Sequence, residues 1–122
     1  MRSVNKYNEL VIKYGNSVNF LTIYIREAHA SDSEWPDTRT YSIKNHRTLT
    51  DRLEAAAGLQ EFGVAGRLMV DSMDDLSLLH YGALPERLCV IGTNGVVLYL
   101  GEMGPWGYSL NDLEHCLENL IE

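Results

Sequence analysis

The feature that most constrains this chain is the run FLTIYI at residues 20–25, which a polar segment follows directly. The run is too short for a helix and consists of apolar, aromatic and β-branched residues. It therefore predicts a strand that is buried on both faces. Ligands of open α/β sheets lie just beyond the carboxyl ends of the strands. The junction after residue 25 is consequently the first candidate for a functional site.

The polar segment that follows the strand, residues 26–32, has the sequence R-E-A-H-A-S-D. If the backbone stays extended there, Glu27, His29 and Ser31 project to one side, because side chains alternate along a strand. A carboxylate, an imidazole and a hydroxyl on one rim indicate a site rather than a simple turn.

Length and charge narrow the class of protein. The 122 residues suit one domain with a real core. Ten basic and seventeen acidic residues give a net charge of −7, and no basic cluster supports binding to nucleic acid. No apolar run approaches the roughly 18 residues that a membrane-spanning helix needs. Cys89 and Cys116 form no paired metal or redox motif and suit small buried apolar positions.

Hydrophobic periodicity predicts alternating helices and strands. We expect helices at 4–14, 49–62, 76–81 and from 109 onward, and strands at 20–25, 67–71, 87–91 and 96–100. Thr48 or Thr50 can cap the second helix, and Thr93-Asn94-Gly95 predicts a hairpin turn. The order is that of an α/β, thioredoxin-like domain, with a central mixed sheet flanked by helices, that lacks its opening strand. The connection from 26 to 47 is long enough to suggest a functional loop.

Several sequence blocks resemble one family. They are the run at 20–32 containing E-A-H-x-S-D, the N-H-R-x-L-x-D-R pattern at 45–52, Y-G-A-L-P-E-R-L at 81–88 and G-P-W-G-Y at 104–108. In this order they resemble the iodothyronine deiodinases over nearly the whole chain.

The resemblance implies a thioredoxin-fold enzyme that removes iodine reductively from thyroid hormones. Its nucleophile would be a selenocysteine, or less often a cysteine, at the end of a first strand just upstream of Met1. A thiol reductant would supply electrons, and no bound cofactor is expected. A homodimer is also implied. Family members carry an N-terminal anchor in the endoplasmic reticulum or plasma membrane, which these residues do not include, so localisation stays open.

The resemblance also assigns roles to individual residues. Glu27 and His46 match a proton-relay pair, and His29 matches the substrate-binding histidine. Tyr24, near the strand end, is grouped with His29 as a substrate-binding residue. For Glu86 and Arg87 two interpretations stay open, a structural salt bridge or loop anchor and a catalytic support.

Two departures and two alternatives accompany this interpretation. The segment Ala65-Gly66-Arg67 lacks a cysteine that helps regenerate the nucleophile in some members, and Met103 replaces a substrate-gripping basic residue. The ring that loses iodine therefore stays open. The alternative function is a non-catalytic thioredoxin-fold binding or regulatory protein that has lost its nucleophile. Carboxylates and imidazoles at 27, 29, 32 and 46 suit zinc or iron, but their spacing is not typical, so we expect no metal.

Overall fold

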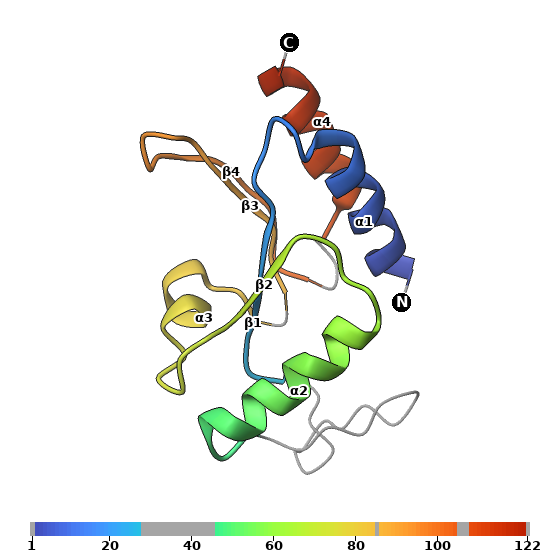
Figure 1. Cartoon of the computed structure of the whole chain (residues 1–122). Coiled ribbons are helices and arrows are strands. Elements are labelled where there is room, and N and C mark those ends of the chain that lie inside the picture. Colours follow the sequence, from blue (N-terminus) through green and yellow to red (C-terminus); the bar gives the residue numbers. More distant parts are fainter. Residues whose placement is uncertain (1, 28–45, 85, 105–107, 122) are drawn as a thin grey trace.

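The computed structural model describes residues 2–27, 46–84, 86–104 and 108–121 (Figure 1). The elements are α1 (Arg2–Tyr14), β1 (Leu21–Tyr24), α2 (Leu49–Glu61), β2 (Arg67–Val70), α3 (Leu76–Tyr81), β3 (Cys89–Ile91), β4 (Val97–Leu100) and α4 (Leu110–Ile121). This order confirms the predicted alternation and the α/β class. Within the described ranges, each helix falls short of the length and apolarity that crossing a bilayer requires.

The strands form two pairs. β1 runs parallel to β2, with Leu21 opposite Arg67 and Tyr24 opposite Val70. β3 and β4 are antiparallel and form the predicted hairpin. Its turn needs Gly95, because the backbone there has φ +82°, a left-handed conformation that only glycine adopts without strain.

One buried cluster lies between α1 and α4, which run side by side in Figure 1. Its members are Leu10, Tyr14, Leu110, Leu113 and Leu117. Phe20 before β1, Val90 of β3 and Tyr99 of β4 pack against it. The core beneath α1 and α4 therefore reaches both the β3–β4 hairpin and the residue that leads into β1.

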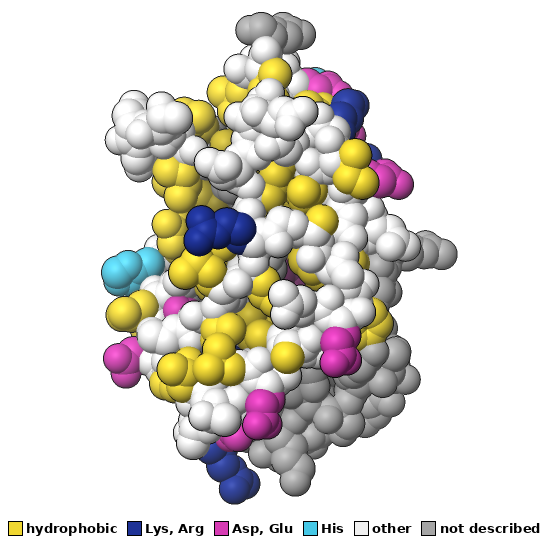
Figure 2. All heavy atoms as spheres, viewed as in Figure 1, with side chains coloured by type: hydrophobic (Ala, Val, Ile, Leu, Met, Phe, Trp, Pro, Cys, Tyr) yellow, Lys and Arg dark blue, Asp and Glu magenta, His cyan; other side chains and the backbone are white. Residues whose placement is uncertain are grey.

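The two faces of β1 differ. Thr22 Oγ1 donates a hydrogen bond to the Tyr7 hydroxyl at 3.2 Å, and the Phe20 ring meets the Tyr7 ring edge-on with centroids 5.8 Å apart. Leu21 and Ile23 point the other way and remain 48% and 36% exposed. Figure 2 shows hydrophobic side chains spread over a face of the molecule. The prediction that this strand is buried on both faces is therefore wrong, because α1 covers only one of them.

The start of α2 is held by a capping box. Thr48 Oγ1 accepts a hydrogen bond from the Asp51 N–H at 3.1 Å, and the Asp51 carboxylate accepts from the Thr48 N–H at 3.3 Å. The same carboxylate accepts from the Arg47 N–H at 3.0 Å. Of the two predicted caps, Thr48 is the correct one. These bonds fix the backbone immediately after His46.

The start of α3 is held by one buried carboxylate. Asp71, which is 3% exposed, accepts hydrogen bonds from the backbone N–H groups of Ser72, Ser77 and Leu78 at 2.9–3.0 Å. Burial by itself raises the pKa of the Asp71 carboxyl, but the bonds from Ser77, Leu78 and Ser72 outweigh it and hold the pKa below its ordinary value.

We expect Asp71→Asn to lower the free energy of unfolding at pH 7 by about 1–3 kcal/mol, because an amide cannot accept all three bonds. The folded pKa lies below the unfolded value of about 3.9, so the carboxylate stabilises the fold above that pH. This contribution is lost as the pH falls through the folded pKa. Urea unfolding at pH 7 and at about pH 3 should therefore show the gap between variant and parent shrinking in acid.

The matched control is Asp74→Asn, which changes an exposed carboxylate in the same turn. It should alter the free energy of unfolding by no more than about 0.5 kcal/mol. A gap for Asp71→Asn that stays constant between the two pH values would contradict the assigned role.

Candidate functional site

The site begins where β1 ends. Tyr24 is the last residue of β1, and its hydroxyl donates a hydrogen bond to the Glu27 carboxylate three residues later. Burial, followed by the hydrogen bond to Glu27, raises the pKa of the Tyr24 hydroxyl well above its usual range. Tyr24 therefore keeps its proton and acts as a donor to Glu27.

His46 approaches the same place from the other side. Its ring lies 5.6 Å from the Tyr24 ring, centroid to centroid, at an angle of 43°. Burial, followed by the positive charge of Arg52, lowers the pKa of His46 below its ordinary value of 6.5. Three carboxylates oppose this shift without reversing it: Glu27, Asp51 and Asp75. The imidazole is therefore neutral near pH 7.

Tyr24 contacts both of the residues that the family resemblance pairs as a proton relay. Glu27 bonds to the Tyr24 hydroxyl, and His46 contacts the Tyr24 ring. Within the described residues, Glu27 is hydrogen-bonded to Tyr24 and His46 is hydrogen-bonded to Arg52. Glu27 and His46 are not hydrogen-bonded to each other in this part of the chain. The structure thus brings Tyr24, Glu27 and His46 together, with the tyrosine in the middle.

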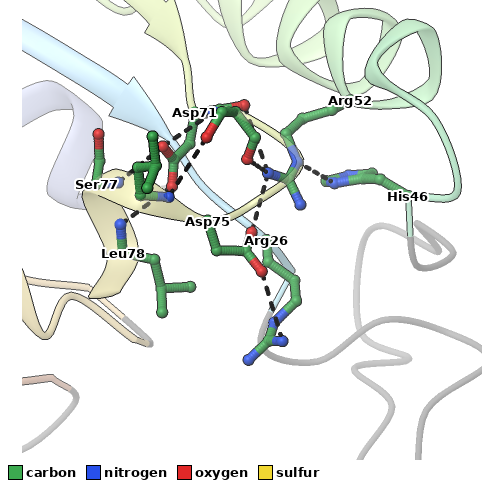
Figure 3. Close-up of polar contacts among 9 residues, drawn as sticks. Arg26, His46, Arg52, Asp71, Asp75, Ser77 and Leu78 are labelled. Atoms are coloured by element: carbon green, nitrogen blue, oxygen red, sulfur yellow. Dashed lines mark hydrogen bonds and ion pairs between the residues drawn. The ribbon is translucent and has the colours of Figure 1, made fainter. Parts of the chain in front are cut away.

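Arg52 lies behind His46, in the first turn of α2, and is 2% exposed. Its Nε donates a hydrogen bond to His46 Nδ1 at 3.0 Å. Its Nη1 donates to the carbonyl oxygens of Ser72 at 2.7 Å and Asp71 at 3.4 Å, and to the Asp75 carboxylate at 3.1 Å. Figure 3 shows the guanidinium lying between the histidine and the turn that follows β2.

Asp75 completes this arrangement. It adopts a left-handed backbone conformation with φ 57°, which is uncommon for a residue other than glycine. Its carboxylate pairs with Arg52 at 3.1 Å and with Arg26 at 3.7 Å, as Figure 3 shows. The two arginines therefore connect the end of β1 and the start of α2 to the same turn.

One atom of this cluster stands out. His46 Nε2 is buried and has no hydrogen-bond partner among the described residues. A buried polar nitrogen without a partner costs about 1–3 kcal/mol, so such atoms commonly mark the place of a ligand. The geometry therefore offers one hydrogen-bonding position that a bound molecule could use.

The other predicted site residues fall elsewhere. His29, like Ser31 and Asp32, lies outside the described residues. Glu86 is exposed, whereas Arg87 donates hydrogen bonds to the carbonyl oxygens of Gly101 at 2.7 Å and Tyr81 at 3.1 Å. Of the two interpretations left open for Arg87, these contacts favour the loop anchor. Among the described residues, no group of three histidine, cysteine or acidic side chains could hold a metal.

Sequence reasoning missed Arg52 and Asp75 as parts of this cluster. One signal was present for Arg52, because a positive charge in the first turn of a helix is unfavourable there. Arg52 follows the capping residues Thr48 and Asp51 directly, which places it in that turn. Asp75 carried no such signal, since an acidic pair in a turn is ordinarily solvated.

Comparison with known proteins agrees with the resemblance in the sequence. A family model described as iodothyronine deiodinase matches residues 1–121. Similar proteins include the type I iodothyronine deiodinase of Xenopus laevis, 42% identical over 94% of this chain and 45% of that protein. They also include the thyroxine 5-deiodinases of Ovis aries and Homo sapiens, each 41% identical over 100% of this chain and 41% and 40% of those proteins. The chain spans less than half the length of these relatives.

The family model covers almost the whole chain, and the cluster at the end of β1 takes Tyr24 and Glu27 from the run at 20–32 and His46 and Arg52 from the N-H-R-x-L-x-D-R block. The chain belongs to the iodothyronine deiodinase family.

Proposed function

We propose that this chain takes part in the reductive removal of iodine from an iodothyronine, with a thiol as the electron donor. The observation that carries the proposal is the cluster of Tyr24, Glu27 and His46 at the end of β1, with His46 Nε2 buried and unpartnered among the described residues. Deiodination needs a proton at the carbon that loses iodine, and this cluster has the groups to deliver one.

The proposed reaction has three requirements. A selenolate or thiolate attacks the iodine, and the electron pair of the carbon–iodine bond stays on the ring carbon. That carbon takes a proton, which forms the carbon–hydrogen bond. The iodine bound to selenium or sulfur is then released as iodide when a thiol supplies two electrons. The described residues would serve the second requirement, the proton.

The two cysteines of the chain are poor candidates for the attacking group. Burial raises the pKa of the Cys89 thiol, and a raised pKa disfavours the thiolate that a nucleophile must be. Cys116 is half-buried on α4, where it lies beside Tyr99 of β4 rather than in the cluster at the end of β1. We therefore place the nucleophile, a selenocysteine or a cysteine, on a strand outside residues 1–122.

The pairing of β1 with β2 and of β3 with β4 leaves room for such a strand. Within the described residues, β1 is hydrogen-bonded only to β2 and β3 only to β4. Phe20 before β1 and Val90 of β3 pack against the same core, so the two pairs lie over one hydrophobic layer. A strand between β1 and β3 would satisfy both open edges and would complete a thioredoxin-like mixed sheet.

The alternative function is a thioredoxin-fold binding or regulatory protein without a nucleophile. The coding sequence upstream of the Met1 codon separates the two functions. The proposal expects an in-frame selenocysteine or cysteine codon, preceded by codons for an apolar strand. A genuine initiation site without upstream coding potential would favour the binding protein.

The activity test uses the full-length protein, an iodothyronine and dithiothreitol, with iodide release as the measurement. We expect release from the full-length protein and none from residues 1–122 alone. Release from residues 1–122 that Cys89→Ser abolishes would show that the nucleophile has been misplaced. A full-length protein that binds the iodothyronine but releases no iodide would overturn the proposed function.

A further inference from the structure

Arg52 occupies a costly position. It lies in the first turn of α2, where the helix dipole opposes a positive charge, and it is 2% exposed. A buried charge is tolerated only when partners replace the lost water. Nη1 has such partners in the carbonyl oxygens of Ser72 and Asp71 and in the Asp75 carboxylate. These contacts account for the Nη1 side of the guanidinium but not for its Nε.

The Nε of Arg52 determines the protonation of His46. An arginine side chain has donors only and does not titrate, so the bond of 3.0 Å requires His46 Nδ1 to accept. A nitrogen that accepts carries no proton. The neutral imidazole must therefore carry its proton on Nε2, the atom that is buried without a partner among the described residues.

We propose that Arg52 is a positioning residue, which holds His46 in the tautomer with its proton on Nε2 and presents that proton to the reacting groups. The second half of the proposal rests on the proposed function. The capping box that starts at Thr48 holds the backbone beside His46, and Arg52 then sets the orientation of the ring. Tyr24 packs against the ring on the side of β1.

The charge of Arg52 also suits the proposed proton transfer. When the iodothyronine carbon that loses iodine takes the proton from His46 Nε2, negative charge is left on the imidazole until a proton from solvent replaces it. The guanidinium at Nδ1 stabilises that charge and opposes the doubly protonated ring. The charged and titratable groups around the ring are Arg52, Glu27, Asp51, Asp75 and Tyr24.

A purely structural role would make a different prediction. If Arg52 only anchored the turn after β2, any residue that bound Ser72 and Asp75 would leave His46 unchanged. Lysine is suited to this distinction, because its single nitrogen can reach the turn but cannot also offer a second donor at the position of Nε. Arg52→Lys therefore retains the charge and removes the contact with His46.

The test is to observe the ring nitrogens of His46 by NMR in the full-length protein labelled with ¹⁵N-histidine. In the unmodified protein we expect the proton on Nε2 at neutral pH. In Arg52→Lys we expect a mixture of the two tautomers and a higher pKa for His46. Iodide release should fall about tenfold or more in kcat with little change in KM.

The matched control is Arg26→Lys, which alters the other arginine that pairs with Asp75, whereas the hydrogen bond to His46 Nδ1 comes from Arg52. It should leave the tautomer unchanged. A proton on Nδ1 in the unmodified protein, or an unchanged tautomer in Arg52→Lys, would overturn the proposal. If Arg52→Lys fails to fold, the spectrum of the unmodified protein decides alone. The expected tautomer without any iodide release would overturn the proposed function and leave the orienting role of Arg52 standing.

Discussion

His46→Ala should lower the turnover of the full-length protein by about 10²- to 10⁴-fold, the usual loss when a group that transfers a proton is removed. KM should change little, because the imidazole is proposed to act on the reacting atoms rather than to hold the substrate. The measurement is the steady-state rate of iodide release at saturating iodothyronine and thiol.

The pH profile gives a second, independent readout for His46. Its pKa lies below 6.5 in the folded protein, and the neutral ring is the active form. Turnover of the unmodified protein should therefore stay constant at pH values above the pKa of His46 and decline at pH values below it. The decline follows because protonation of Nδ1 breaks the hydrogen bond from Arg52. His46→Ala should lack this acidic decline.

Two comparisons sharpen this prediction. His80→Ala removes an exposed histidine of α3 and should leave turnover unchanged. His29→Ala should act at least partly through substrate affinity, because the family resemblance gives His29 a substrate contact. Equal losses for His29→Ala and His46→Ala, with unchanged pH profiles, would contradict the separate roles.

Leu117→Ala should lower the free energy of unfolding by about 2–5 kcal/mol. Leu117 is 1% exposed and lies at the centre of the cluster between α1 and α4, so the truncated side chain leaves a cavity that its neighbours cannot fill. A loss of this size is a large part of the 5–15 kcal/mol by which a domain is typically stable. Urea unfolding followed by circular dichroism measures it.

The control is Leu120→Ala on the same helix, because Leu120 is 48% exposed. It makes the same chemical change without opening a cavity, and it should cost no more than about 0.5 kcal/mol. Similar losses for the two variants would mean that α4 does not pack against α1 in solution.

Local sequence determined the elements. The spacing of apolar residues predicted the four helices and four strands of the described residues in their correct order. Thr48 and Gly95 act through bonds or backbone freedom within a few residues of themselves, so their roles could be predicted without the fold. The candidate site could be predicted only in part. The strand end by itself pointed to Glu27, whereas Tyr24 and His46 came from the family resemblance.

Which faces are covered and which charges are buried depends instead on how distant elements pack together. The run at 20–25 is apolar throughout, and nothing local shows that Leu21 and Ile23 stay exposed while Thr22 meets Tyr7 of α1. The burial of Arg52 and its acceptors become evident only when α2 is set beside the turn after β2. Its charge is tolerated only there, because its acceptors come from residues some 20 positions later in the chain. Hydrogen bonds between segments so far apart depend on how the elements pack, which no short-range pattern specifies.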